Sequence, residues 1–452
     1  MRSPMNDPNE HLDGGGAELP PVVAQALRRV ARPDYHRWEA MVHASGCCAE
    51  PVRLAGRVLQ ADPGGELHVV YSTAGEADKV LLKACETRRA TRCPACAAIY
   101  RGDAKVLLRA GLDDTTTDAE LGPVVFATLT APSFGMVHGA SVPPSRCRNA
   151  PEGVTCRHGR PLACLEVHDL ADSVVGGAIC ADCYDWENAV IFNSRVGALW
   201  HHTVIAVARH LAAAADIRIR VFNQHWRLSF AKVVEFQGRG VVHVHALVRL
   251  DHLDDSRAAL DDSDLATAVI AAATRVAVTN PLDPARRVRW GTQMDVQPIP
   301  PERRRIASAY LAKYATKSAD GEGLLDHRLR SLHHLEQLEL TEQLRRMATV
   351  AWNLGARPEL RELNLRAWAH CLGYRGHWLT KSRYWSTTFT ELRARRRAWR
   401  LEQLGIDPDD IDGRIGEWEY QGVGHLTAGD AWLAASAAAR RELNRRTAWE
   451  ER

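Results

Sequence analysis

The alternation of apolar and polar positions along the chain predicts both helices and strands. Residues 21–53 repeat apolar side chains at helical spacing, and a second helix-like run ends near residue 215. Residues 124–130 (VVFATLT) are apolar and β-branched and end at Ala-Pro, which indicates a buried strand. Helical and strand patterns therefore alternate along one stretch of chain.

The clearest local prediction is a β-hairpin. The turn residues Gly238, Arg239 and Gly240 lie between two runs rich in β-forming residues. These runs are RIRVFNQHWRLSFAKVVEFQ and VVHVHALVRL. The sequence RVRWGTQMDVQPI predicts a further strand, and ERRRIASAYLAKYATK predicts a helix after it. Strands before, around and after helices predict an α+β domain over residues 121–320.

The rest of the chain is expected to form four further segments. Residues 1–20 are polar and Gly-rich, which predicts a flexible tail, and residues 21–120 predict a helical segment with the first Cys-x-x-Cys pair. Residues 145–185 are rich in cysteine, glycine and proline and predict an insertion in the central domain. Residues 321–452 predict a separate, mostly helical region.

Composition and charge limit what this chain can do. Of its 452 residues, 46% are hydrophobic and 25% are charged, which argues against wholesale disorder. The formal net charge is only +3, so any surface for nucleic acid must be local. One local run is typical either of a DNA-binding surface or of a solvated helix face. It consists of Arg393, Arg395, Arg396, Arg397 and Arg400.

Targeting signals and cysteine usage point to one compartment. The N-terminal residues lack the basic and then apolar order of a secretion signal. No run reaches the roughly 18 apolar residues that a membrane helix needs. We therefore expect a cytoplasmic protein without a membrane partner. In a reducing compartment, eleven cysteines favour metal thiolates over disulfides.

Two histidines in the predicted hairpin are candidate metal ligands. His243 and His245 are two apart on a strand, so both imidazoles point to one face of the sheet. Glu235 on the partner strand would add a carboxylate oxygen, and Gln237 is an alternative third ligand. Such a set suits a divalent ion that also holds a substrate oxygen. The alternative is a histidine pair that faces solvent on a half-exposed sheet.

Two tyrosines on the predicted helix are candidate nucleophiles. Tyr310 and Tyr314 are four apart and share one face, and Lys313 and Lys317 extend that stripe. A tyrosine that breaks a DNA strand stays covalently attached, which conserves the bond energy for rejoining. Its ordinary pKa is about 10, so lysines or a metal-polarised phosphate would assist it. The alternative is an amphipathic helix with core tyrosines and lysines that reach solvent.

Three motifs, in this order, resemble the HUH endonuclease superfamily: FATLT (126–130), HVHAL (243–247) and YLAKY (310–314). The tyrosines follow the histidines, as in the replication initiators of that superfamily and unlike in its conjugative relaxases. A wider set of motifs is similar to the rolling-circle replication initiators of actinobacterial plasmids and integrative elements. The set spans residues 93–389 and comprises CPAC, CADCYDW, GRGVVHVHALVRL, WGTQMDVQPI, YLAKYATK and LGYRGHWLTKSRYWSTTF.

This resemblance implies an HUH-type domain with a central antiparallel sheet flanked by helices. It implies that single-stranded DNA at a plasmid origin is cleaved, with a 5′-phosphotyrosine on Tyr310 or Tyr314. A host DNA polymerase would extend the free 3′-hydroxyl. His243 and His245 would hold Mg²⁺ or Mn²⁺. Two alternatives stay open: a two-tyrosine HUH transposase and a non-catalytic, zinc-containing DNA-binding regulator.

The cysteines predict structural zinc. Two Cys-x-x-Cys pairs have zinc-knuckle spacing and predict one Zn²⁺ site that joins the insertion to the segment before the first strand. These pairs are Cys93 with Cys96, and Cys180 with Cys183. A second zinc site within the insertion has metal-free loop residues as its alternative. Its candidate ligands are Cys147, Cys156, Cys164, His158 and His168. No partner pattern involves Cys47, Cys48, Cys85 or Cys371.

The C-terminal region mixes aromatic and basic residues. The run HCLGYRGHWLTKSRYWSTTFTELRARRRAW suits phosphate contacts combined with base stacking, and it equally fits a helical core with a basic exterior. Origin recognition is therefore one of two interpretations. The phosphate-binding sequence G-x-x-x-x-G-K-[ST] does not occur, so a host helicase would be needed to unwind DNA.

Overall fold

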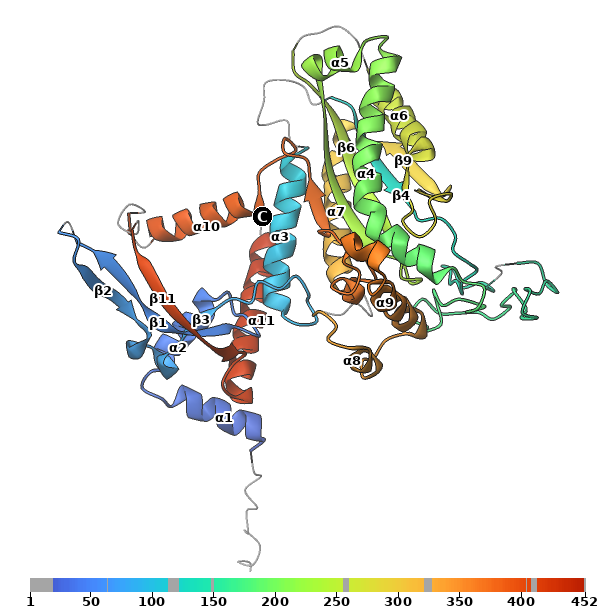
Figure 1. Ribbon diagram of the computed structural model, residues 1–452. Coiled ribbons are helices and arrows are strands. Elements are labelled where there is room, and N and C mark those ends of the chain that lie inside the picture. The colour runs from blue at the N-terminus through green and yellow to red at the C-terminus, as the bar shows by residue number, and fades with distance from the viewer. Residues whose placement is uncertain are drawn as a thin grey trace, which may run out of the picture. The chain divides into compact units, whose positions relative to one another are not determined.

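The computed structural model divides the chain into two compact units (Figure 1). One unit combines Met1–Ala98 with Leu401–Arg452, and the other spans Ile99–Arg400. The boundaries predicted at residues 120 and 320 differ from these units, because the two ends of the chain fold together. The described residues are 19–62, 64–112, 122–147, 150–254, 260–320, 327–403, 405–407 and 413–450, without the side chains of 316–320, 446 and 448–450. The tail predicted for residues 1–20 lies, except for its last two residues, outside this description.

A five-stranded sheet forms the centre of the second unit. Its strand order is β10-β5-β6-β4-β9, and every neighbouring pair is antiparallel. The strands are β4 (Val124–Leu129), β5 (Trp226–Phe236), β6 (Val242–His252), β9 (Met294–Pro298) and β10 (Leu379–Lys381). A separate two-stranded sheet pairs β7 (Ala277–Thr279) with β8 (Arg287–Arg289). The prediction of an α+β protein with an antiparallel sheet is confirmed.

Helices cover both faces of this sheet (Figure 1). The helices α4 (Trp186–Ala214) and α6 (Asp262–Arg275) pack on the face that carries Val125 and Val244. On the opposite face, α7 (Arg304–Asp320) packs against Val233 and Leu247. Burial on both faces explains why the central strands appear as nearly continuous apolar runs in the sequence.

The second unit contains further helices, of which α3 begins and α10 ends in residues of the first unit. They are α3 (Pro94–Ala110), α5 (Ile219–His225), α8 (Leu332–Glu336), α9 (Glu342–Leu354) and α10 (Phe389–Gln403), with 3₁₀ turns at Pro301–Arg303, Pro358–Leu363 and Ala369–Cys371. Side-chain caps mark where the long helices begin. Asp185 accepts a hydrogen bond from the backbone of Asn188 at the start of α4, and Asp261 forms a capping box with Asp264 at the start of α6.

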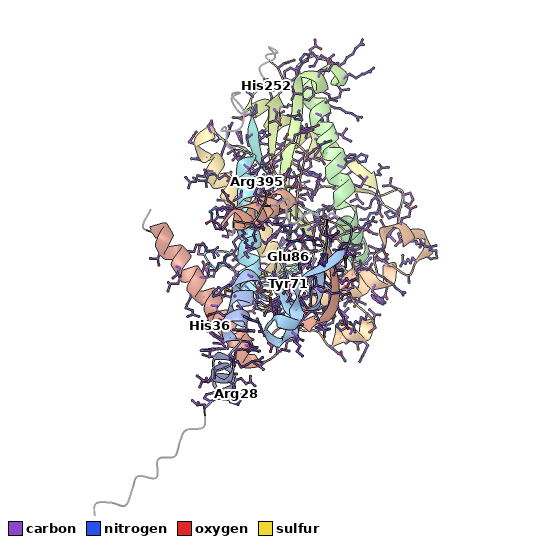
Figure 2. All side chains as sticks on the ribbon, turned by 90° about the vertical axis from the view of Figure 1, so that its left-hand side faces the viewer. Arg28, His36, Tyr71, Glu86, His252 and Arg395 are labelled. Carbon is purple, nitrogen blue, oxygen red and sulfur yellow. The ribbon has the colours of Figure 1, made fainter. Side chains whose placement is uncertain are left out.

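The first unit is a small antiparallel sheet packed with helices from both ends of the chain. Strand β1 (Val52–Ala61) pairs with β2 (Leu67–Ser72), β3 (Leu81–Lys83) and β11 (Ile415–Val423). The helices are α1 (Pro21–Val30), α2 (Tyr35–Ala44) and α11 (Ala428–Glu450), with 3₁₀ turns at Thr73–Gly75 and Ala77–Lys79. Arg28 on α1 and His36 on α2 are exposed and are labelled in Figure 2.

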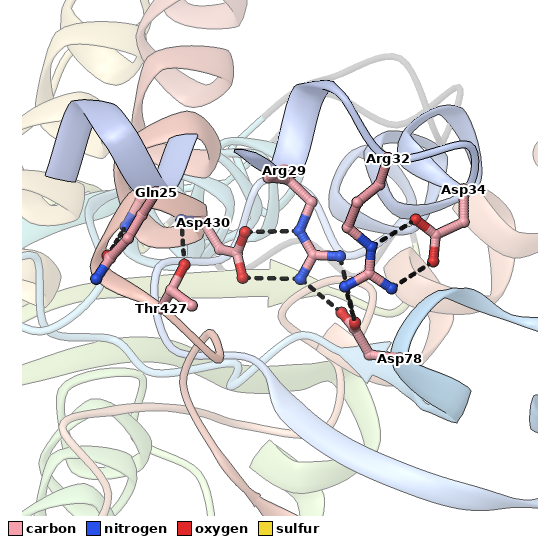
Figure 3. Close-up of polar contacts among 8 residues, drawn as sticks. Gln25, Arg29, Arg32, Asp34, Asp78, Thr427 and Asp430 are labelled. Atoms are coloured by element: carbon pink, nitrogen blue, oxygen red, sulfur yellow. Dashed lines mark hydrogen bonds and ion pairs between the residues drawn. The ribbon is translucent and has the colours of Figure 1, made fainter. Parts of the chain in front are cut away.

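A buried ion-pair network joins the two ends of the chain within this unit (Figure 3). Arg29 on α1 donates hydrogen bonds of 2.7 and 2.9 Å to Asp430 on α11, and one of 2.7 Å to Asp78. Arg32 also donates to Asp78, at 2.9 Å. Although burial opposes the charge, the hydrogen bonds with both carboxylates raise the pKa of Arg29. Together with the pairing of β11 with β1, this network joins the last fifty residues to the first hundred.

Strands occupy parts of both regions that were predicted to be helical. β1, β2 and β3 lie within residues 21–120, and between β1 and β2 the backbone of Gly65 donates a hydrogen bond of 2.9 Å to the carbonyl of Asp62. β10 and β11 lie within residues 321–452. β10 is three residues long and depends on its pairing with β5, whereas β11 is mostly exposed and lacks an apolar run. Within the described ranges, no helix has both the length and the apolar character needed to cross a bilayer.

Candidate active site

The β5–β6 hairpin carries the two predicted histidines. Its register places Glu235 directly opposite His243. The turn closes as the backbone of Gln237 donates to the carbonyl of Val241 at 2.9 Å. Gly240 has a φ of 76°, a left-handed conformation that glycine adopts without a steric penalty. The predicted hairpin is confirmed from Trp226 onward, but Ile219–His225, which were predicted as part of its first strand, form the helix α5. The tight turn fixes which residues face each other.

Glu235, His243 and His245 form a compact group of three side chains. Nε2 of His243 lies 3.1 Å from Oε2 of Glu235, and Nε2 of His245 lies 3.5 Å from the same oxygen. Glu235 and His245 are buried, whereas His243 is half-buried. Gln237, the alternative third ligand, instead accepts a hydrogen bond of 2.9 Å from Nε of Arg239. The structure therefore brings together the three ligands favoured from the sequence.

The chemistry of this group fits a divalent ion such as Mg²⁺ or Mn²⁺. The two imidazole nitrogens and the carboxylate oxygen all lie within 4.8 Å of one another. Three protein ligands leave coordination positions open for water or a phosphate oxygen. The hydroxyl of Thr128 lies 3.1 Å from Nδ1 of His245, so Nε2 is the nitrogen that faces Glu235.

Helix α7 places both predicted tyrosines at this group. The ring of Tyr314 stacks on the ring of His245, with centroids 4.0 Å apart and an interplanar angle of 25°. The hydroxyl of Tyr310 lies 2.6 Å from the hydroxyl of Tyr314. Tyr310 is 48% exposed and Tyr314 is half-buried. Burial, followed by the hydrogen bond with Tyr310, raises the pKa of Tyr314.

The position of the tyrosines follows from the apolar stripe of α7. Leu311 and Ala315 of this stripe are buried against Ala231 and Val233 of β5. Small residues at these contacts allow the helix to approach the sheet closely. Lys313 lies on the same helix and is exposed. The side chain of Lys317 lies outside the described residues.

The arginine run lies on α10 but does not form one uniform surface. Arg393, Arg395 and Arg397 are exposed, and Figure 2 labels Arg395. Arg396 is half-buried and donates a hydrogen bond of 2.8 Å to Asp103 on α3. The structure therefore separates a structural arginine from its exposed neighbours.

Within the described part of the chain, nine of the eleven cysteines and three histidines gather in three groups of four. In each group, the candidate ligand atoms lie within 4.8 Å of one another. The groups are Cys48, Cys85, Cys93 and Cys96; Cys156, His158, Cys180 and Cys183; and His138, Cys147, Cys164 and His168.

These groups correct both predicted zinc sites. The two Cys-x-x-Cys pairs do not share a site, because each pair is completed by other residues of its own unit. The second predicted site also divides, since Cys156 and His158 join one group while Cys164 and His168 join another. A Cys-x-x-Cys motif identifies only half of a site. The other half comes from loops, and no local spacing marked Cys48, Cys85 or His138.

Comparison with known proteins decides the family. The family RepSA, described as "Replication initiator protein, pSAM2", matches residues 34–439 of the 452. The chain belongs to the RepSA family of replication initiators. A replication initiator protein of Streptomyces ambofaciens is 39% identical to this RepSA member over an alignment of 459 residues. The alignment covers 95% of this chain and 96% of that protein. No solved structure matches the chain.

The matched range of this RepSA member includes the β5–β6 hairpin, α7 and all three cysteine groups. The family assignment supports replication over the transposase alternative.

Proposed function

We propose that this RepSA protein is an HUH-type nickase that starts rolling-circle replication by cutting and rejoining one DNA strand at its origin. The observation that carries the proposal is the stacking of Tyr314 on His245 at 4.0 Å. In this contact a phenol from α7 lies beside the candidate metal ligands of the hairpin. A nucleophile and a group able to hold a phosphate-binding ion are the two components that strand cleavage needs.

The nicking step uses the phenol oxygen of Tyr310 or Tyr314. This oxygen attacks the phosphorus of the scissile phosphodiester, and the bond from phosphorus to the 3′-oxygen breaks. The phenol loses its proton and the 3′-oxygen gains one, which leaves a 5′-phosphotyrosine and a free 3′-hydroxyl. One phosphodiester is exchanged for another, so the reverse attack by a 3′-hydroxyl rejoins the strand without ATP.

Glu235, His243 and His245 would hold the Mg²⁺ or Mn²⁺ ion, which when bound withdraws negative charge from the phosphate oxygens. Glu235 also keeps both imidazoles in place, since its Oε2 lies within 3.5 Å of Nε2 of each. Lys313 is exposed on the nucleophile-bearing helix and supplies positive charge for the DNA backbone.

The two phenols divide two successive transfers between them. Their hydroxyls lie 2.6 Å apart, so a phosphate that reaches one phenol is also within reach of the other. One tyrosine opens the origin and the other receives the strand when the circle closes. A host helicase and a host DNA polymerase would then provide unwinding and extension.

The test is whether DNA becomes covalently attached. The full-length protein is incubated with Mn²⁺ and a single-stranded oligonucleotide that carries the origin strand, and denaturing gels show any adduct. We expect an adduct whose attached peptide, identified by mass spectrometry, contains Tyr310 and Tyr314. The double variant Tyr310→Phe/Tyr314→Phe should lose it, while Tyr420→Phe, which changes an exposed tyrosine on β11, should keep it. An adduct in the double variant contradicts the assignment. DNA binding without any wild-type adduct supports the non-catalytic regulator instead.

A further inference from the structure

We infer that the protein holds three structural zinc ions, one in each of the three four-residue groups. The Cys₄ site consists of Cys48, Cys85, Cys93 and Cys96 in the first unit. The Cys₃His site consists of Cys156, His158, Cys180 and Cys183, and the Cys₂His₂ site of His138, Cys147, Cys164 and His168, both in the second unit. All three ligand sets are typical of closed structural zinc sites.

The distances between ligand atoms match the edges of a zinc tetrahedron. With Zn–S near 2.3 Å and Zn–N near 2.0–2.1 Å, the edges are about 3.8 Å between two sulfurs and about 3.3 Å between two nitrogens. Sγ of Cys48 lies 3.8 Å from Sγ of Cys93. Nδ1 of His138 lies 3.3 Å from Nε2 of His168. The side chains are therefore already arranged around a point that one ion can fill.

Backbone amides point at the sulfurs of all three sites. An N–H donor at a ligand sulfur is a typical outer contact of a metal site, because it holds the ligand in place and offsets part of the negative charge of a metal-bound sulfur. The donated bonds are Cys85 N to Cys48 Sγ (3.2 Å), Ala49 N to Cys93 Sγ (3.3 Å), Gly139 N to Cys147 Sγ (3.2 Å) and His158 N to Cys156 Sγ (3.4 Å).

The Cys₂His₂ site also has an outer carboxylate. Nε2 of His168 lies 3.3 Å from Sγ of Cys164, and its Nδ1 lies 3.2 Å from Oδ2 of Asp172. A carboxylate behind an imidazole holds the ring and its tautomer so that the other nitrogen can bind a metal. His168 is buried, so its orientation is fixed by these contacts.

The insertion between β4 and α4 has little other support. In its described residues, β pairing is confined to three isolated bridges: Val137 with Ala178, Arg146 with Val167, and Thr155 with Pro161. Many of its apolar side chains are exposed, including Val142 at 77%. A segment with few hydrogen bonds between strands and a small hydrophobic core gains most of its stability from bound metal.

The insertion contacts the turn of the hairpin that carries Glu235 and His243. Gly176 approaches the turn so closely that a Cβ on it would lie 2.2 Å from the carbonyl carbon of Gly238. Arg239 in the turn donates a hydrogen bond of 3.0 Å to the carbonyl of Pro132, at the start of the insertion. The Cys₃His and Cys₂His₂ ions therefore support the turn that sets the positions of these two side chains.

The test counts zinc ions in the intact protein by native mass spectrometry and elemental analysis. We expect three zinc ions per chain in the wild type, and two in each of Cys96→Ala, Cys183→Ala and Cys164→Ala. The double variant Cys96→Ala/Cys183→Ala should retain one ion. If both Cys-x-x-Cys pairs shared a single site, the double variant would retain as many ions as either single variant. Cys47→Ala is the matched control, because this buried cysteine adjoins Cys48 and belongs to none of the three groups.

A measurement on the wild type covers variants that fail to fold. A strong chelator should remove three zinc ions and make the nine cysteines of the three sites reactive. Alkylation before and after the chelator measures this change. Fewer than three zinc ions, iron in place of zinc, or zinc loss in Cys47→Ala would overturn the inference. Because these readouts contain no DNA, they stand or fall separately from the proposed nickase activity.

Discussion

The hydroxyl oxygen of Thr128 on β4 lies 3.1 Å from Nδ1 of His245 on β6, its direct neighbour in the strand register. This contact connects the first motif of the chain, FATLT, to the second, HVHAL. A threonine there holds one nitrogen of the imidazole and leaves the other to face Glu235. Thr128 thus acts as a positioning residue for a proposed metal ligand.

Thr128→Val is expected to weaken the divalent-ion site while it preserves the volume of the side chain. Loss of an outer hydrogen bond to a ligand typically lowers metal affinity about 10- to 100-fold. The Mn²⁺ concentration for half-maximal cleavage of origin DNA should rise by that factor, and Thr128→Ser should restore it. A Thr128→Val protein with the wild-type Mn²⁺ dependence would show that this contact is only structural.

Glu235 and Gln237 provide a matched pair for the third ligand. Glu235→Gln removes the charge that faces both imidazoles, so cleavage should need at least about tenfold more Mn²⁺. Gln237→Ala should leave the Mn²⁺ dependence unchanged, because the Gln237 amide oxygen is bonded to Arg239. Equal effects of both changes would mean that the carboxylate has no special role. Binding of uncut DNA serves as the control for folding.

Much of the central domain could be predicted because its signals are local. Alternation and a Gly-rich turn define the β5–β6 hairpin, and the period of two places His243 and His245 on one face. Helical spacing similarly places Tyr310 beside Tyr314. Whether Glu235 or Gln237 lies beside the histidines depended on the exact length of the turn, and the register places Glu235 opposite His243.

The membership of the three cysteine groups and the unit boundaries could not be predicted because they depend on contacts distant in sequence. Cys48 precedes β1 and Cys85 follows β3, so the pairing of these two strands brings both cysteines to the same end of the sheet. The ion pair between Arg29 and Asp430 joins residues 401 positions apart. Neither relationship leaves a spacing pattern in the chain, because the partners are brought together by the fold and not by neighbouring positions.

The two tyrosines should differ in the first cleavage step. Tyr310 is 48% exposed, whereas burial and the hydrogen bond with Tyr310 raise the pKa of Tyr314. We expect Tyr310 to attack the incoming strand, so Tyr310→Phe should reduce the initial rate of adduct formation more than tenfold. Tyr314→Phe should reduce it less than threefold and instead impair rejoining. Single-turnover gels measure both steps, and the reverse order of effects would assign the first attack to Tyr314.

The arginines of α10 should separate into DNA-binding and structural residues. Replacement of Arg395 and Arg397 by Gln should flatten the dependence of log affinity on log salt, by about 0.7 for each lost phosphate contact on single-stranded DNA. Arg396→Gln should leave that slope unchanged and lower the melting temperature, because it removes the ion pair with Asp103. Binding isotherms at several salt concentrations distinguish the two groups. An unchanged slope in the double variant would make the run a solvated helix face.

The buried Lys232 on β5 should lower the free energy of unfolding at neutral pH. Its side chain is only 6% exposed, and its Nζ lies 6.0 Å from the ring centroid of Trp200. Burial lowers the pKa of Lys232 to about 8. A buried ammonium loses its hydration, so the folded protein carries the charged form at a cost. The difference between this pKa and the ordinary lysine pKa of 10.5 corresponds to a cost of about 3 kcal/mol in folding free energy, at roughly 1.4 kcal/mol per pKa unit.

The sign of this effect fixes its pH dependence. Below about pH 8 both folded and unfolded chains carry the proton, so the full cost is present. Between about pH 8 and 10.5 the unfolded chain binds more protons than the folded one, and stability contributed by this site rises with pH. Lys232→Met should therefore raise the free energy of unfolding at pH 7, by up to about 3 kcal/mol, with a gain that shrinks toward pH 10.5. Urea unfolding of both proteins across this range measures it, with the exposed Lys105→Met as the control. A gain that stays constant with pH would come from packing alone and not from the buried charge.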